Sequence, residues 1–559
     1  MSERSMREAI HFMEEEKQFH LGFLPTEQSN PLTAHLDREF AKSGIDGVAN
    51  LQSVDRSVLA MARKIFAGPE FRKLVDAAEQ TLRDGGKIVF SGCGATGRLS
   101  ILLECMYRDC CKNTPALARY ADQVFSIMTG GDYALVRSVE FFEDYQSFGR
   151  RQVRDLGMSD RDMLVAITEG GETSSVLGTL FEALEIGAKG FLLFNNPAEL
   201  LAEHLERSRR AIRDKRVTVL DLFCGPMALA GSTRMQATTS EQLVAGAALE
   251  AVIDRLLGNP VRDYAAEFAG VLDALEAPEA RKAMADYIAF EAEIYRKHGL
   301  VTYFADDYLL DIFTDTTERS PTFMLPPFRK TDDAVSPRPW AFVKNPLRST
   351  REVWAHGMNR PLRCLEWQVD DYRKMGAPEA ILGNPPKIQA AELLKFAVGK
   401  EFAEDRTATG NDAAVLVTLG TGRTNEELER AFGKIDAPFA FRKHLAVGGA
   451  GDFTVPCALE HSPLELMSHM AVKLVLNTVS TGTMAVLGRI TGNWMSYVDV
   501  TNKKLLDRGI RLIAEIGKLD YKESCFKLFE AVEELARTTR ASEEKISAVQ
   551  YVLNRLGER

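Results

Sequence analysis

The chain has 559 residues, of which 45% are hydrophobic, and a formal net charge of −10 at pH 7. Its length predicts two or three domains with more than one core. The negative charge disfavours nucleic-acid and membrane partners, so a small anionic ligand would need a local positive pocket. The eight cysteines show no CxxC pair and no zinc-type spacing. The N-terminal residues are charged and show no apolar leader segment. Together with the cysteine pattern, they predict a reduced, cytoplasmic chain without a metal.

Residues 1–50 are expected to form an N-terminal arm. Within it, residues 26–33 read Thr-Glu-Gln-Ser-Asn-Pro-Leu-Thr, a polar, proline-containing run that favours neither helix nor strand. This segment either wraps the first domain or contacts a ligand. Helical periodicity follows over 53–84 and ends at Gly85-Gly86, a typical helix stop.

Residues 51–265 are predicted to form a first α/β domain. Short apolar strands alternate there with helical segments. The strands are expected at 87–90, 121–128, 163–167, 190–194 and 217–222. Such alternation predicts a parallel sheet with helices on both faces. A helix over 232–257 is expected to close the domain.

A second cycle of the same kind is predicted over 280–500. Its strands are expected at 300–304, 340–343 and 414–419, and a long helix at 464–487. That helix contains His469, Lys473 and Asn477, so it is predicted to be buried in protein and not to span a membrane. Residues 501–559 are predicted to be wholly helical. The repeated organisation indicates an internal duplication.

A glycine-rich loop joins the first strand to its helix and reads Ser-Gly-Cys-Gly-Ala-Thr-Gly-Arg over 91–98. Its glycines let backbone N–H groups approach a ligand closely, and the next helix presents its positive end. Thr96 adds a hydroxyl, so the loop suits an anion. Dinucleotide-binding folds use similar loops but need an acidic residue closing the next strand. Asp122 lies at the start of that strand, which disfavours this alternative.

A second loop, residues 168–175, follows the third strand and repeats this chemistry. Its glycines and hydroxyl side chains are Thr168, Gly170, Gly171, Thr173, Ser174 and Ser175. Thr173 or Ser174 could simply cap the next helix. Because adjacent strand ends meet at one edge of a parallel sheet, a pocket shared by the two loops is the favoured interpretation.

Several segments, in the same order along the chain, resemble the sugar isomerase (SIS) domain family. The closest resemblance is to the branch that joins N-acetylmuramic acid 6-phosphate etherase and the glucokinase regulatory protein. The segments are 26–31, 92–99, 130–132 continuing to 143–144, 231–235, and 473–482 with Gly488, Asn493 and 501–505. The resemblance implies two flavodoxin-like SIS domains plus a helical C-terminal cap. The chain resembles this tandem form more than the single-domain etherase, which pairs into a dimer.

The resemblance also implies a phosphorylated sugar as the ligand, at one site per chain and without a cofactor. The residues implied to bind it are Gly94, Ala95, Thr96, Gly97, Arg98, Thr168, Gly170, Thr173, Ser174 and, from the second lobe, Lys473. Lys473 could instead be a helix lysine that reaches the surface. The family's second loop often reads Ser-Gly where this chain has Gly170-Gly171. Glu169 and Glu172 also place negative charge near the expected phosphate.

The etherases use two glutamates for acid–base elimination of lactate from C3 of the sugar, and one of them corresponds to Glu143. The other aligns with Met106, while Glu104 lies two residues away on another side of the helix. In the second lobe, residues 315–323 resemble the segment of the etherases that contains this second glutamate. Glu318 stands at the position of that glutamate. Glu143 and Glu318 could therefore form one composite catalytic site. Alternatively, Glu318 is a relic without a role.

Three functions follow from the resemblance. The leading one is a sensor of a ketohexose or amino-sugar 6-phosphate, resembling the glucokinase regulatory protein, with a sugar kinase as a conceivable partner. The alternative is an N-acetylmuramic acid 6-phosphate etherase, a carbon–oxygen lyase. The third is a sugar-phosphate isomerase or deaminase, which the etherase-type segments disfavour.

Overall fold

The structure is a computed structural model that describes residues 2–557. Its first lobe is built on a five-stranded sheet in the order β2-β1-β3-β4-β5. Every neighbouring pair is parallel. The strands are β1 (Ile88–Gly92), β2 (Val124–Met128), β3 (Met163–Ile167), β4 (Lys189–Phe194) and β5 (Val217–Asp221). This is the flavodoxin-like strand order, so the predicted fold class is confirmed.

The second lobe repeats this topology. Its sheet has the order β10-β9-β8-β6-β7, again with parallel neighbours. The strands are β6 (Val301–Phe304), β7 (Ala341–Lys344), β8 (Ala413–Leu419), β9 (Phe441–Val447) and β10 (Phe453–Val455). Read from β7, the order is β7-β6-β8-β9-β10, so the second strand, the first, the third, the fourth and the fifth follow one another as in the first sheet. An internal duplication requires this agreement.

Strands β9 and β10 were missed by the sequence patterns. β9 begins with exposed, charged residues and becomes buried only in its second half, and β10 is three residues long at the sheet edge. Neither presents the continuous apolar run that identifies a buried parallel strand. The start of β2 was also placed too early, because Pro115 opens a short 3₁₀ helix that lasts to Tyr120.

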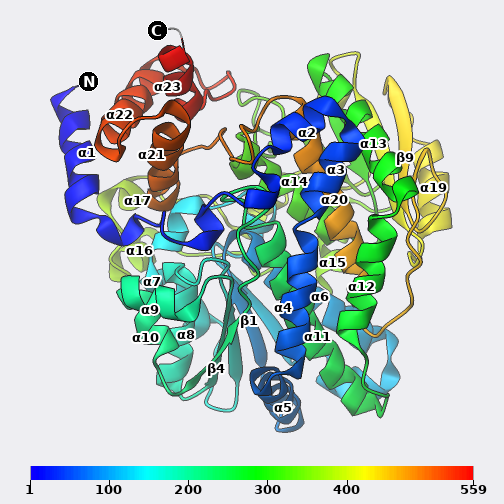
Figure 1. The fold of residues 1–559 in the computed structure, drawn as a ribbon. Coiled ribbons are helices and arrows are strands. Elements are labelled where there is room, and N and C mark those ends of the chain that lie inside the picture. Colours follow the sequence, from blue (N-terminus) through cyan, green and yellow to red (C-terminus); the bar gives the residue numbers. More distant parts are fainter. Residues whose placement is uncertain (1, 558–559) are drawn as a thin grey trace.

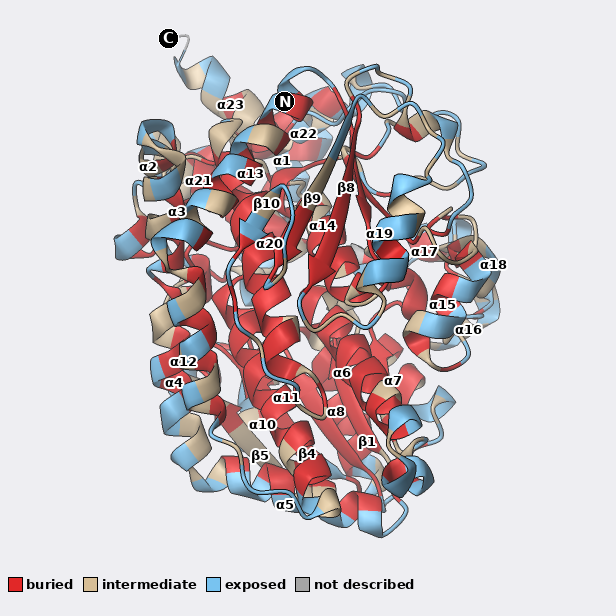
Figure 2. Cartoon of the chain, turned by 90° about the vertical axis from the view of Figure 1, so that its right-hand side faces the viewer, coloured by how far each residue is buried: buried red, intermediate tan, exposed pale blue. Residues whose placement is uncertain are grey.

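Helices cover both faces of each sheet, and the strands between them are mostly buried (Figure 2). In the first lobe they are α4 (Asp55–Ala67), α5 (Pro69–Arg83), α6 (Gly94–Asn113), α7 (Gln146–Asp155), α8 (Ser174–Ile186), α9 (Ala198–His204), α10 (Glu206–Ile212) and α11 (Gln236–Leu257). The helices of the second lobe's part of the chain are α12 (Tyr264–Leu275), α13 (Pro278–Arg296), α14 (Leu309–Phe323), α15 (Thr350–Met358), α16 (Val369–Lys374), α17 (Glu379–Gly383), α18 (Ala390–Leu393), α19 (Asn425–Gly433) and α20 (Leu466–Val486), of which α16 is bonded to α7 of the first lobe. Helix α11 begins four residues later than predicted. Among the described helices, none is both long and apolar enough to cross a membrane.

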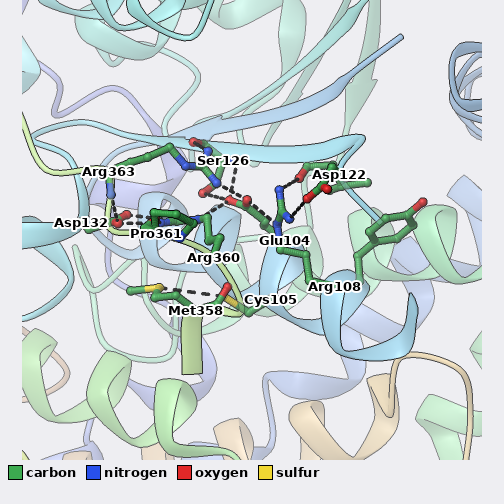
Figure 3. Close-up of polar contacts among 12 residues, drawn as sticks. Glu104, Cys105, Arg108, Asp122, Ser126, Asp132, Met358, Arg360, Pro361 and Arg363 are labelled. Atoms are coloured by element: carbon green, nitrogen blue, oxygen red, sulfur yellow. Dashed lines mark hydrogen bonds and ion pairs between the residues drawn. The ribbon is translucent and has the colours of Figure 1, made fainter. Parts of the chain in front are cut away.

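The two lobes pack closely together, with α14 lying against α6 and α20 against α11. A polar cluster fixes the second lobe against β2 (Figure 3). Arg360 and Arg363 of the second lobe both pair there with Glu104 of α6. The Arg360 guanidinium also donates to both oxygens of Asp132, at 2.6 and 2.8 Å. Burial would raise the pKa of Asp132, but Arg360 and Arg363 lower it overall.

The first helix of the N-terminal arm lies beside the C-terminal cap, and the later arm helices pack against α13 and α20 of the second lobe (Figure 1). The arm contains α1 (Glu3–Glu15), α2 (Leu36–Lys42) and α3 (Gly44–Gln52), and the cap contains α21 (Lys503–Gly517), α22 (Tyr521–Thr538) and α23 (Ala548–Gly557). Residues 539–547 are not helical, so the expectation of a wholly helical end was wrong over this loop. Residues 25–27 and 31–33 form single 3₁₀ turns.

A buried ion-pair cluster joins the arm to the cap. Both oxygens of Glu27 accept hydrogen bonds from the Arg508 guanidinium, at 2.6 and 2.9 Å, and Arg511 donates a third at 2.9 Å. Burial opposes the negative charge, yet the two arginines lower the pKa of Glu27 to about 2. The polar segment of the arm therefore anchors helix α21.

Candidate functional site

The glycine loop sits at the point where the strand order of the first sheet reverses, between β1 and β3. A Cβ on Gly92 would lie 2.4 Å from the Thr96 backbone, so only glycine allows α6 to approach β1 this closely. Gly94 has φ +56, and a Cβ there would meet nothing within 4 Å. The loop therefore has one tightly packed side and one open side, and ligands of open α/β sheets bind at such switch points.

The open side of the loop faces a cavity of about 90 Å³ between the lobes. The first lobe supplies Gly94 and Ala95 at the start of α6, together with Glu143 and Thr173. The second lobe supplies Glu318 from α14. Three separate parts of the chain meet here, because the cap adds Lys504 and Arg508 from α21.

Of the residues expected from the sequence to form the site, five line this cavity: Gly94, Ala95, Glu143, Thr173 and Glu318. Six others do not, namely Thr96, Gly97, Arg98, Thr168, Gly170 and Ser174. Thr96 closes the loop on itself, since its Oγ1 accepts from the Cys93 N–H at 3.1 Å. Thr168 donates to the Thr173 Oγ1 at 2.9 Å, which orients the threonine that does reach the cavity.

Arg98 is buried and points away from the open side of the loop. Its guanidinium forms an ion pair with Glu318 and donates to the carbonyl oxygens of Ala134, at 2.9 Å, and Leu135, at 3.1 Å. A guanidinium fixed by backbone oxygens holds its carboxylate partner in one place. Arg98 thus positions Glu318 across the boundary between the lobes and does not contact the cavity.

Lys473 also lies away from this cavity. Its ammonium group donates to the Arg234 carbonyl at 2.9 Å, the Thr239 Oγ1 at 2.7 Å and the Asn477 Oδ1 at 3.0 Å. It lines a smaller neighbouring cavity of about 20 Å³, which shares Glu318 with the first. Burial lowers the pKa of Lys473 to about 7. Lys473 is 8% exposed, so the surface-lysine alternative is wrong, and its contact with a sugar phosphate stays a prediction.

Lys504 is the cation that the sequence reasoning missed. Its Nζ lies 3.6 Å from Glu143 Oε1, and its charge also acts on Glu169 and Glu172. The signal that could have found it was its place in the 501–505 segment, to which no role was assigned. Glu172 is turned aside by an ion pair with Arg207 at 2.7 Å, so the cavity receives Glu169 but not Glu172.

The carboxyl groups of the cavity have different environments. Burial raises the pKa of Glu143, although Lys504 opposes the shift. Burial likewise raises the pKa of Glu169 to about 7, again opposed by Lys504. Glu318 instead has its charge paired with Arg98. Two carboxyl groups held in different environments thus face a single cavity, which is the arrangement that acid–base chemistry needs.

Glu104, the other acid near the missing catalytic position, is not available for chemistry. It is fully buried and accepts from Arg108 at 2.9 Å and from the Ser126 hydroxyl at 2.6 Å, in addition to its ion pairs with Arg360 and Arg363 (Figure 3). Its oxygens are thus committed to holding the lobes together.

The corresponding switch point of the second lobe is filled by its own side chains. Asp306 follows β6 and accepts from Asn345 at 2.5 Å and from Arg348 at 3.1 Å. Next to it, the Tyr308 hydroxyl bonds the Thr421 hydroxyl at 2.7 Å. A loop with aspartates in place of open glycines disfavours an anion.

Comparisons with known proteins agree with this architecture. A profile of the glucokinase regulatory protein N-terminal SIS domain matches residues 70–184. N-acetylmuramic acid 6-phosphate etherase 1 of Bacillus licheniformis is 30% identical over 225 residues, which are 40% of this chain and 67% of that protein. The etherase of a Synechococcus species is 33% identical over 256 residues, 45% of this chain and 74% of its own.

Solved structures of phosphosugar enzymes align more weakly. Tagatose-6-phosphate ketose/aldose isomerase from Escherichia coli covers 80% of this chain and 93% of its own, with 9% identity and a TM-score of 0.44. A likeness of that size identifies neither ligand nor reaction. The sequence matches are stronger, and the profile match at 70–184 includes the glycine loop. On these matches, the chain belongs to the SIS-domain family of the N-acetylmuramic acid 6-phosphate etherases, and its first lobe resembles that of the glucokinase regulatory protein.

Proposed function

We propose that this protein binds one phosphorylated sugar, a ketohexose or amino-sugar 6-phosphate, in the cavity between its lobes and acts as its sensor. The observation that carries the proposal is the convergence of Gly94, Ala95, Thr173 and Lys504 on one cavity. The N-terminus of the 20-residue helix α6 presents a positive dipole end to a phosphate at Gly94 and Ala95, while a capping box occupies the N–H groups of Cys93 and Thr96. Lys504 adds a full positive charge.

A single site per chain is supported by the difference between the lobes. Only the first lobe follows its switch-point strand with open glycines, while the second lobe places Asp306 and Tyr308 there. The carboxylates around the cavity would then face the sugar hydroxyls, and the phosphate would lie at the start of α6.

Calorimetric titration tests this proposal. Fructose 6-phosphate, N-acetylglucosamine 6-phosphate and N-acetylmuramic acid 6-phosphate are titrated separately into the full chain, with the unphosphorylated sugars as blanks. We expect one equivalent of at least one of these phosphates per chain. Lys504→Met should weaken that binding about tenfold or more, because it removes a charge-assisted contact. The matched control, Lys522→Met on the exposed face of α22, should bind as the unmodified chain does.

Three outcomes would contradict the proposal. They are the absence of binding by all three phosphates, binding of two equivalents, and equal affinities in the Lys504 and Lys522 variants.

Binding should also tighten as the pH falls from 8 to 7. A phosphate arriving beside Glu169 favours the protonated form of that carboxyl, whose pKa is about 7 in the free protein. Binding above pH 7 then takes up a proton, so the affinity decreases as the pH rises, by up to about tenfold per pH unit. Glu169→Gln should flatten the profile between pH 7 and 8. An unchanged slope in this variant would show that Glu169 is not the linked group.

A second candidate function, elimination of lactate from N-acetylmuramic acid 6-phosphate, is favoured by one specific observation. Glu143, whose pKa is raised by burial, and Glu318, which is ion-paired with Arg98, line the same cavity from different lobes. Such an elimination needs a base to take the proton from the carbon next to C3 and an acid to protonate the departing oxygen. In this proposal Glu318 is the base and Glu143 is the acid.

A further inference from the structure

A second and larger cleft lies on the other side of helix α14. Its volume is about 690 Å³, within the range that small-molecule ligands occupy. It is bounded by α14, the segment 324–341 and the cap, where α22 and the loop before α23 form one wall. Pro321 is the only residue that lines both this cleft and the phosphate cavity. The two spaces are therefore separate, with α14 between them.

The walls of this cleft are largely apolar. Leu325, Phe328 and Trp340 line it from the second lobe, and Val532 and Leu535 line it from α22. Val532 is 36% exposed. Apolar side chains that remain accessible beside a hollow of this size provide a surface for the apolar part of a ligand.

Two polar groups of the walls lack a partner. The Thr316 hydroxyl has no hydrogen-bond partner among the described side chains and backbone, although the residue is only 4% exposed. Arg137 is half-buried, and its guanidinium has no hydrogen bond or ion pair with any side chain that the structure describes, a set that leaves out the side chain of Glu140. The two belong to adjoining parts of the wall, because the Thr317 hydroxyl donates to the Val136 carbonyl at 3.5 Å. Native proteins seldom leave a buried hydroxyl unpaired, so this one points to a missing partner.

Most of the other cations of the cleft have a carboxylate partner. Lys545 pairs with Asp499 at 2.6 Å, and Arg329 pairs with Asp405 at 2.9 Å. Glu544 accepts from the Trp340 indole N–H at 2.7 Å. Arg540, Glu543 and Glu544 line the cleft from the cap, whereas Arg137 lies on the side of Thr316 and has no paired carboxylate among the described side chains. That side of the cleft is complementary to a molecule with one anionic group and an apolar body.

We propose that this cleft is a second ligand site, for a small amphipathic carboxylate. The carboxylate contacts Arg137 and accepts the Thr316 hydroxyl proton in a hydrogen bond, and the apolar body lies against Phe328, Trp340 and Leu535. Helix α14 presents Thr316 to this cleft and Glu318 to the phosphate cavity. A ligand in this cleft contacts helix α14, which also carries Glu318. The site is therefore suited to an effector that alters the phosphate cavity.

Fluorescence titration of the full chain with 8-anilinonaphthalene-1-sulfonate, an apolar probe with one anionic group, tests the proposal. We expect saturable binding that decanoate displaces and decylamine does not, because only decanoate carries the sign of charge that Arg137 attracts. Arg137→Gln should weaken binding about tenfold, the change that 1.4 kcal/mol represents. The control, Arg63→Gln on the exposed face of α4, should leave the affinity unchanged.

A second variant keeps the test decisive if Arg137→Gln does not fold. Ala536 lies at an exposed position of α22 on the cleft wall, so Ala536→Phe should fill the cleft and abolish binding without disturbing the fold. Unaltered probe binding in the folded variants would overturn the proposal. Displacement by decylamine as readily as by decanoate would do the same. Displacement of the probe by fructose 6-phosphate with the affinity of that sugar for the first site would show that the two sites are one.

Discussion

Lactate release from N-acetylmuramic acid 6-phosphate should fall about a thousandfold when Glu318 is replaced by glutamine, and by a similar factor in Glu143→Gln. General acid and base groups each contribute about 10²–10⁴ in rate, and a glutamine of the same shape can neither take nor give the proton. The measurement is lactate produced per chain by the purified protein and by each variant, under saturating substrate.

The matched control for these variants is Glu427→Gln, which alters an exposed glutamate of α19 in the second lobe. It should release lactate at the unmodified rate. If the unmodified chain releases no lactate while still binding a sugar phosphate, the elimination proposal fails and the sensor proposal stands. If Glu318→Gln alone retains full activity, the second lobe contributes no catalytic group and Glu318 is the relic that the sequence left open.

Replacing Glu27 by glutamine should reduce the free energy of unfolding by about 3–5 kcal/mol. Removing one partner of a buried ion pair leaves the other charge uncompensated, and here Arg508 and Arg511 would both lose Glu27. Since α21 carries Lys504 and Arg508 into the cavity, sugar-phosphate binding should weaken in the same variant.

The stabilisation by Glu27 should also depend on pH in a defined direction. Its pKa is about 2 in the folded protein against 4.5 for the ordinary group, so the stabilisation is fully present above about pH 4.5. It is lost as the pH falls from about 4.5 to about 2, by up to about 3 kcal/mol. Thermal unfolding across this range should therefore show a shallower acid dependence in Glu27→Gln. Glu427→Gln, at an exposed position of α19, should follow the unmodified chain. Identical acid profiles for all three proteins would exclude Glu27 as an anchor.

The fold could be predicted well from the sequence wherever the signal is local. Buried parallel strands such as β1 and β3 are short, continuous apolar runs, and the glycines that follow β1 mark the turn into α6. By contrast, β9 has charged residues over its first half. It becomes a strand because β8 pairs with it, which the pattern of its own residues cannot indicate.

The candidate site likewise contains residues that local sequence patterns reveal and residues that they do not. Gly94, Ala95 and Thr173 were found because they lie in loops whose composition is unusual for their position. Arg98 belongs to the same loop but turns toward the other lobe, since its partner Glu318 is supplied from 220 residues away. Lys504 reaches the cavity only because Glu27 anchors α21, a long-range relation that no local pattern contains.

Both halves of the cavity stand on a single polypeptide, and this has a consequence for how the protein behaves on dilution. In a dimer that completes its site with a residue from the neighbouring subunit, the site is lost once the concentration falls below the dissociation constant. Here the connection between the lobes keeps the local concentration of Glu318 high at any protein level. The covalent link also removes the requirement that both copies carry both halves. Under the proposed composite site, one copy is free to lack the phosphate loop, and the other the second glutamate, without loss of the whole.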